Sequence, residues 1–157
     1  MLKDKVSQIW SGITARIADR RISSQEIADT LKNNFEGYLN SYPSLKDESA
    51  LAQIFHETSL ELFKSYTPFV DGKLKSRDMV SQIRETYAAM SEVYKRLAQE
   101  KGEQGFIAMH LAFVTSKKIS RVSDEKLEEA LRLARPSLKL LAYRYEREKA
   151  KYPGRTQ

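Results

Sequence analysis

The chain has 157 residues, of which 41% are hydrophobic and 31% charged, a balance typical of one globular domain over residues 1–157 rather than of a disordered chain. It has no cysteine, which excludes disulfide frameworks, thiolate metal sites and cysteine nucleophiles. Charges also interrupt the N-terminal segment, so we expect a cytoplasmic protein with neither a signal peptide nor a membrane span. The net charge of +6 arises in the second half, because residues 1–70 carry 8 Lys and Arg against 9 Asp and Glu, whereas residues 71–157 carry 19 against 12. This asymmetry favours an acidic partner.

Two helices are predicted in the first forty residues. The first, over residues 3–20, has apolar positions at three- and four-residue spacing, which places them on one face. The second begins at Ser23, which forms a capping box with Glu26, and Ile22 can pack against Ile27 across this start. The apolar face of the first helix consists of Val6, Ile9, Trp10, Ile13 and Ile17.

A third helix is expected from near Ser44 to the region of Pro68. Its buried side would include Leu51, Ile54, Leu62 and further apolar or aromatic residues up to residue 66. Pro68 and the Asp71-Gly72 pair then mark the clearest break in the middle of the chain. Because the charge balance changes at the same place, we treat this break as the boundary between a near-neutral and a basic subregion.

The basic half begins with the most regular helix, over residues 77–101. Its apolar residues alternate at spacings of three and four, which is the pattern of a seam against a partner helix. Gly102 and Gly105 are expected to end this helix. The following helix, over residues 104–117, is apolar nearly all round, which predicts a central position in the core. The seam consists of Val80, Ile83, Tyr87, Met90, Tyr94 and Leu97.

The last segment is also helical. A helix is predicted to start at Ser123, and Pro136 is expected to end or kink it because proline removes a backbone hydrogen bond and clashes with the preceding turn. A final helix would cover residues 137–151. No segment alternates with period two for long enough to form a strand. The predicted fold is therefore all-α, a single bundle of six or seven helices.

The sequence offers little evidence of a catalytic or metal centre. His56 and His110 lack the spacing of a zinc-binding helix, and both are interpreted as core or rim histidines. Gly102 and Gly105 do not follow a strand and so make no phosphate-binding fingerprint. The acidic residues, for example Glu125 and Glu128, lie among basic neighbours on exposed helix faces and do not form a general acid/base pair. We expect a protein that is not an enzyme and that has no metal and no cofactor.

The basic residues of the second half suggest a surface for a phosphate backbone. On a helical wheel, Arg77, Arg84 and Lys95 share one stripe with small residues between them. Lys117, Lys118 and Arg121 form a second group, and the cations of the last helix form a third. The three groups could line one continuous groove for a phosphate backbone and give salt-dependent, sequence-independent binding. The interpretation depends on their convergence in three dimensions. The predicted nucleic-acid-binding residues are Arg77, Arg84, Lys95, Lys117, Lys118, Arg121, Arg144, Arg147 and Lys151.

Residues 74–152 also carry three short motifs with a family resemblance. They are Ser81-Gln82-Ile83-Arg84, then Leu111-Ala112-Phe113 followed by Lys117-Lys118, and finally Leu141-Ala142-Tyr143-Arg144 with the closing Lys151-Tyr152. In these motifs the chain resembles the small helical subunit of multi-subunit CRISPR effector complexes, of type III-A and the related type I.

The resemblance implies a non-catalytic, RNA-binding subunit of a ribonucleoprotein complex in antiviral defence. Its partners would be the guide–target duplex or a displaced single strand of DNA or RNA, other subunits of the complex, and further copies of itself. The matching positions imply that Arg84, Lys117, Lys118 and Arg144 contact the nucleic-acid backbone.

A second hypothesis requires no nucleic acid. A helical adaptor or chaperone would dock a partner helix on the exposed side of the 77–101 seam, or on an aromatic run in the preceding helix. That run consists of Phe55, Phe63, Tyr66 and Phe69.

Overall fold

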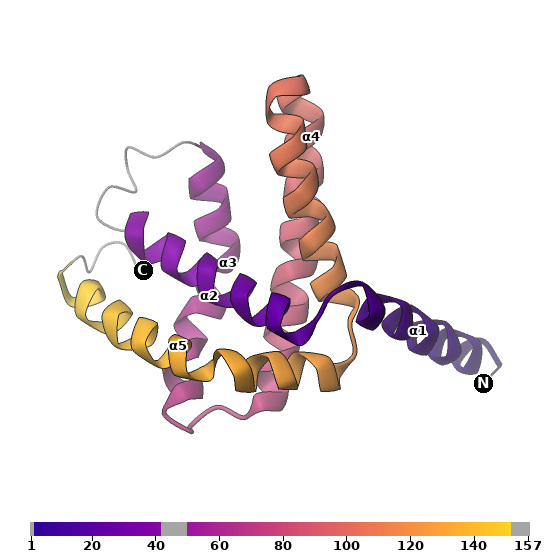
Figure 1. The fold of residues 1–157 in the computed structure, drawn as a ribbon, viewed down its shortest axis with the longest axis horizontal. Helices are drawn as coiled ribbons and strands as arrows, with labels where there is room; N and C mark the ends of the chain where they lie inside the picture. The colour runs from indigo at the N-terminus through magenta and orange to yellow at the C-terminus, as the bar shows by residue number, and fades with distance from the viewer. Residues whose placement is uncertain (1, 42–49, 152–157) are drawn as a thin grey trace.

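The computed structural model describes residues 2–41 and 50–151, and it confirms the all-α prediction for these residues (Figure 1). They contain no strand. The predicted start of the third helix near Ser44 lies outside the described residues. The helices are α1 (Leu2–Arg21), α2 (Ser24–Ser41), α3 (Ala50–Val70), α4 (Ser76–Arg121) and α5 (Asp124–Lys151).

The junction between α1 and α2 has the predicted capping box. The backbone N–H of Glu26 donates to the Ser23 hydroxyl at 3.0 Å, and the backbone N–H of Ser23 donates to the Glu26 carboxylate at 3.2 Å. Ile22 and Ile27 are both buried beside this turn. The box satisfies donors that have no partner inside the helix, so α2 starts where the sequence predicted.

The predicted mid-chain break is a tight turn after α3. Gly72 adopts a φ of +78°, a left-handed conformation that favours glycine, and its N–H donates to the Phe69 carbonyl at 3.1 Å. The carbonyl of Pro68 accepts from Lys73 at 2.8 Å. Pro68 itself lies within the last turn of α3.

Helix α4 differs from the two helices predicted over residues 77–117. Its backbone is helical through Gly102 and Gly105, so one helical element covers both predicted helices. A straight helix of 46 residues would measure about 69 Å. Yet the Arg84 guanidinium reaches the carbonyl of Ser120, 36 residues later, at 2.9 Å. The chain therefore reverses, and α4 forms a first arm (residues 76–100) and a second arm (residues 109–121) that run side by side (Figure 1).

The second arm of α4 is not the central core helix that its composition predicted. Leu111 is 62% exposed, and Ala112, Phe113 and Val114 are only half-buried. Figure 1 shows the reason, because the far end of the two arms rises beyond the other helices. The apolar side chains of residues 111–114 are therefore covered on only part of their surface.

Helix α5 runs without interruption through Pro136, so the predicted division into two helices is wrong. Pro136 lies on the exposed face, where its ring meets solvent. The opposite face holds the helix in place through buried side chains on both sides of the proline. They include Ala130, Leu131, Ala134, Leu138, Ala142 and Tyr145.

One continuous core joins both halves of the sequence. At its centre the Phe35 ring lies 5.1 Å from the Phe63 ring and 5.0 Å from the Tyr66 ring. Tyr145 of α5 is 6.0 Å from the same ring of Phe35. The seam of the first arm of α4 contributes to the same core through its four buried residues before Tyr94, and Tyr94 packs against it. These residues are Val80, Ile83, Tyr87 and Met90. His56 belongs to this core and stacks on Tyr38 at 4.5 Å, as the core interpretation expected.

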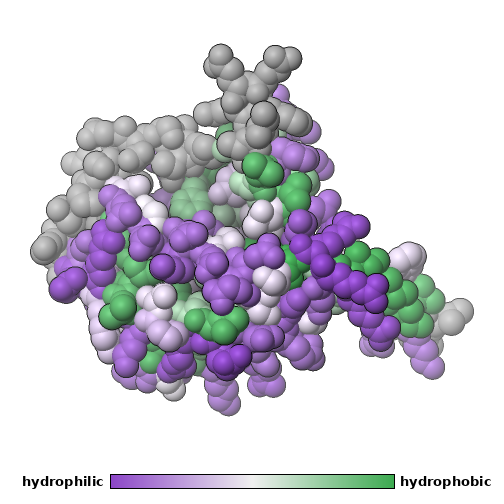
Figure 2. Space-filling view, in the orientation of Figure 1, coloured by the Kyte–Doolittle hydropathy of each residue, from purple (hydrophilic) through white to green (hydrophobic). Residues whose placement is uncertain are grey.

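Helix α1 projects from one side of the bundle (Figure 1). Its base is fixed by Asp19, whose carboxylate accepts from the backbone N–H and the hydroxyl of Ser123 at 2.8 and 2.7 Å. The Lys126 ammonium caps the helix by donating to the carbonyls of Asp19 and Ile22 at 2.6 and 3.0 Å. Hydrophobic surface on the projecting helix is visible in Figure 2. Within the described residues, no helix combines the length and hydropathy required to cross a bilayer.

Candidate nucleic-acid interface

A groove runs between the last two turns of α1 and the second arm of α4. It has a volume of about 440 Å³ and an apolar floor. Four cations line it, Arg21 from α1 and Lys117, Lys118 and Arg121 from α4, and no carboxylate is among its lining residues. The floor consists of Thr14, Ile17, Ala18, Phe113 and Val114.

Local helix geometry places these cations together. Lys118 and Arg121 lie in the last turn of α4, and Arg21 is the last residue of α1. The negative ends of two helix dipoles therefore meet at the groove, where they favour cationic side chains. The Lys117 ammonium also lies 5.2 Å from the centre of the Phe113 ring, one helical turn away, which fixes it over the groove wall by a cation–π contact.

The four groove cations carry no ion pair within the part of the chain that the structure describes. The ion pairs found there involve five other basic residues, Lys64, Arg84, Arg132, Arg144 and Lys149. Positive charge in the groove is therefore not neutralised by the protein itself. An anion that entered the groove would meet cations without displacing a carboxylate.

A second hollow continues the groove along α1. It has a volume of about 740 Å³ and shares Thr14 and Arg121 with the first. Trp10, 63% exposed, lies in its wall, and Asp124 lines its far side, where it is paired with Arg84. We call the two hollows together the α1–α4 groove.

Arg84 is not a free groove cation, which corrects the prediction. Its guanidinium donates to the carbonyls of Ser120 at 2.9 Å and Val122 at 2.8 Å, and it pairs with the Asp124 carboxylate. These groups lie at the C-terminus of α4 and the start of α5. Arg84 therefore ties the first arm of α4 to the connection that follows the second arm.

The α5 cations lie elsewhere, so the predicted convergence into one surface is wrong. Arg144 pairs with Glu148 at 3.0 Å, and Arg147 is exposed near the C-terminal end of α5. Asp124, at the groove, is 23 residues before Arg147, a distance of about 35 Å along the helix. Lys151 is the last residue of α5, and its side chain lies outside the described residues.

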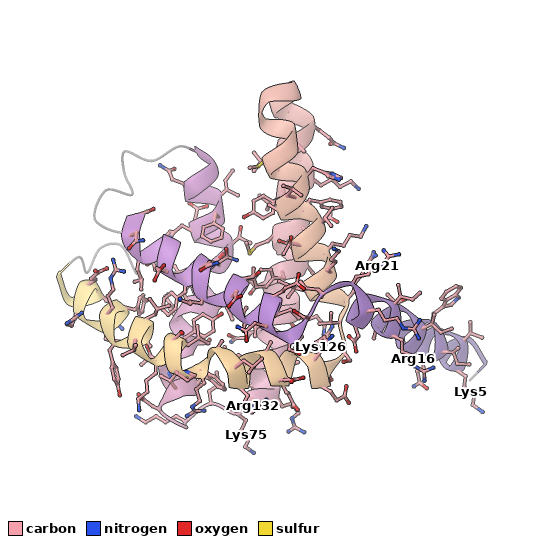
Figure 3. All side chains as sticks on the ribbon, viewed as in Figure 1. Lys5, Arg16, Arg21, Lys75, Lys126 and Arg132 are labelled. Atoms are coloured by element: carbon pink, nitrogen blue, oxygen red, sulfur yellow. The ribbon has the colours of Figure 1, made fainter. Side chains whose placement is uncertain are left out.

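Two further predicted cations are exposed without joining the groove. Arg77 lies in the first turn of α4, and the neighbouring Lys75 points away from the lower edge of the bundle in Figure 3. Lys95 is on the first arm of α4, beside the exposed His110 and the Phe113 ring. Of the nine predicted residues, the structure therefore brings together Lys117, Lys118 and Arg121, with Arg84 at the same groove but paired with Asp124.

The sequence interpretation missed Arg21 and Trp10. Both belong to the near-neutral half, whose total charge is close to zero and therefore does not indicate a basic surface. Figure 3 shows Arg21, Arg16 and Lys5 spaced along α1. The available signal was local: Arg20 and Arg21 form the basic last turn of α1.

The described residues contain no group of three or more His, Asp or Glu side chains that could hold a metal ion. Comparisons with protein families, curated proteins and solved structures gave no match to this chain.

Proposed function

We propose that this protein binds the phosphate backbone of single-stranded RNA or DNA along the α1–α4 groove, as a non-catalytic subunit of a ribonucleoprotein complex. The proposal rests on one observation: four cations without ion pairs, from two helices, line one groove whose floor is apolar. Such a groove attracts phosphates and releases condensed counterions when they bind.

A single strand suits the groove better than a duplex, because its bases are free to stack. Trp10 is exposed beside the cations and Phe113 lies at the groove wall. Aromatic side chains next to a cationic track are the usual arrangement for sequence-tolerant binding of single strands.

The resemblance to CRISPR small subunits is compatible with this proposal in part. Of the four backbone-contacting positions that the resemblance implies, Lys117 and Lys118 line the groove without an ion pair. Arg84 lines it with its guanidinium held by internal partners, and Arg144 pairs with Glu148 elsewhere. We therefore propose the groove itself as the binding surface, whichever ribonucleoprotein contains it.

The two docking surfaces that the sequence suggested for an adaptor are both covered within the part of the chain that the structure describes. Phe63, Tyr66 and Phe69 are buried in the core, and Phe55 packs against it. The seam of α4 is likewise covered within the chain.

The test compares two triple variants that remove the same charge. In one, Lys117, Lys118 and Arg121 are each changed to alanine. In the control, Lys75, Arg132 and Lys139 are changed, all exposed and none among the residues that line the groove. Fluorescence anisotropy with a labelled single strand of mixed sequence, at about 50 mM salt, should show affinity reduced at least about tenfold in the groove variant and little changed in the control. Equal losses in both, or no binding by the native chain, would reject the proposal.

Salt dependence tests the number of contacts. If four cations each contact one phosphate, the slope of log K against log salt should be about −3 for a single strand, or roughly 50-fold weaker binding at 200 mM than at 50 mM salt. The groove variant should have a slope near −1. A native slope that is already near zero would mean that the groove does not hold phosphates.

A further inference from the structure

The apolar side chains of α1 form an exposed stripe that the rest of the chain leaves uncovered. Among the large hydrophobic residues that the structure shows to be exposed, five of nine lie on this one helix. They are Val6, Ile9, Trp10, Ile13 and Ile17, each at least 40% exposed. A contiguous apolar stripe on a projecting helix indicates a contact surface rather than an isolated exposed residue.

The spacing of the stripe allows it to pair with a second copy of itself. Val6, Trp10, Ile13 and Ile17 follow each other at spacings of four, three and four, a seam that reads the same in both directions. Its centre lies between residues 11 and 12, which is also the midpoint of α1 (Leu2–Arg21). Two copies of α1 laid antiparallel in this register overlap along their full length. Val6 then faces Ile17 of the second copy, and Trp10 faces Ile13.

Charge and shape favour the antiparallel arrangement over the parallel one. In a parallel pair, Arg16 of one copy would lie beside Arg21 of the other, on both sides of the seam. In the antiparallel pair, Arg16 lies beside Ile9 of the second copy and can cover it with its aliphatic stem. Because α1 projects from one side of the bundle, an antiparallel pair also keeps the two bundles at opposite ends (Figure 1).

The area is sufficient for a reversible dimer. The five side chains expose roughly 500 Å² per copy, so their pairing would bury about 1,000 Å², the lower end of specific interfaces. We propose that two copies of this protein associate through a two-fold, antiparallel pair of α1 helices. Val6, Trp10 and Ile17 also line the α1–α4 groove, so pairing and strand binding would compete for this face of α1, and the association is therefore measured without nucleic acid.

Sedimentation measures the association. Across protein concentrations from about 1 to about 100 µM, the native chain should pass from one to two chain masses, with half-association near 10 µM. Ile13→Lys should remain at one chain mass. The control Leu140→Lys changes an equally apolar side chain, 71% exposed on α5, and should associate like the native chain. A native chain that stays at one mass over this range, or that instead sediments with anionic vesicles through α1, would overturn the proposal.

Disulfide trapping tests the register, because the chain has no cysteine of its own. Val6→Cys and Ile17→Cys are made separately, and one carries a tag so that the products differ in size. Under mild oxidation the mixture should form the mixed disulfide, whereas each variant alone should not, because its thiols would lie about 16 Å apart along the pair. Efficient crosslinking of Val6→Cys with itself would show a parallel pair and contradict the inference.

Discussion

In α2, the residues Ile27, Leu31 and Phe35 recur at four-residue spacing and are fully buried, whereas in α1 the residues Val6, Trp10 and Ile17 recur at similar helical spacing and are exposed. Both helices have a defined apolar face, so periodicity does not distinguish them. The difference is position: α2 packs along α5, while α1 reaches beyond the bundle and is held at its base by Asp19. The uncovered apolar face is the surface that we propose for association, and the cationic groove at its base is the surface that we propose for an anion.

The largest expected effect on the free energy of unfolding comes from truncating a core aromatic residue, and the same truncation on α1 provides the comparison. Phe35→Ala should lower the free energy of unfolding by about 3–5 kcal/mol, because it removes the ring between Phe63, Tyr66 and Tyr145. Trp10→Ala deletes a larger side chain but should cost no more than about 0.5 kcal/mol in the monomer. Denaturant unfolding at low protein concentration measures both. Similar decreases in the free energy of unfolding for the two variants would contradict the distinction between the buried face of α2 and the exposed face of α1.

An intermediate effect is expected where the two regions join. Arg84→Ala should lower the free energy of unfolding by roughly 1–2 kcal/mol, because the carbonyls of Ser120 and Val122 lose a charged donor at the end of α4. Arg77→Ala, an exposed change on the same helix, is the control and should be nearly neutral. If Arg84→Ala were also neutral and abolished nucleic-acid binding instead, Arg84 would be a contact residue after all.

The smallest effect concerns alkaline pH. Burial raises the pKa of Tyr87 above its ordinary value of 10, against the opposing hydrogen bond that its hydroxyl oxygen accepts from Asn34. The unfolded chain therefore loses this proton first, so stability is complete below pH 10 and falls as pH rises toward the folded-state pKa. Between about pH 9.5 and 10.5, the native chain should lose roughly 0.7 kcal/mol more than Tyr87→Phe.

Unfolding curves at these two pH values provide the measurement. Burial also raises the pKa of Tyr94, to about 12, so the variant should retain part of the alkaline sensitivity. Identical pH dependence of native chain and variant would show that Tyr87 is accessible to solvent.

Local sequence determined the helices and their start signals. The capping box at Ser23 and Glu26 and the turn at Gly72 were predicted because such signals act within a few residues. The cations Lys117, Lys118 and Arg121 were identified for the same reason, since they lie within five positions of each other. Where a local rule competed with packing, packing prevailed: α5 continues through Pro136 because its opposite face is buried.

Tertiary structure alone decided which apolar faces are covered and which cations are free. The sequence predicted the same role for Arg84 and Lys117. In the structure, however, Arg84 caps a helix end formed 36 residues later, whereas Lys117 lines the groove without an ion pair. The contribution of Arg21 likewise depends on α1 meeting the end of α4, a contact between residues about a hundred positions apart. Burial and the pairing of Arg84 with Asp124 are properties of long-range contacts, and no periodicity within one helix specifies them.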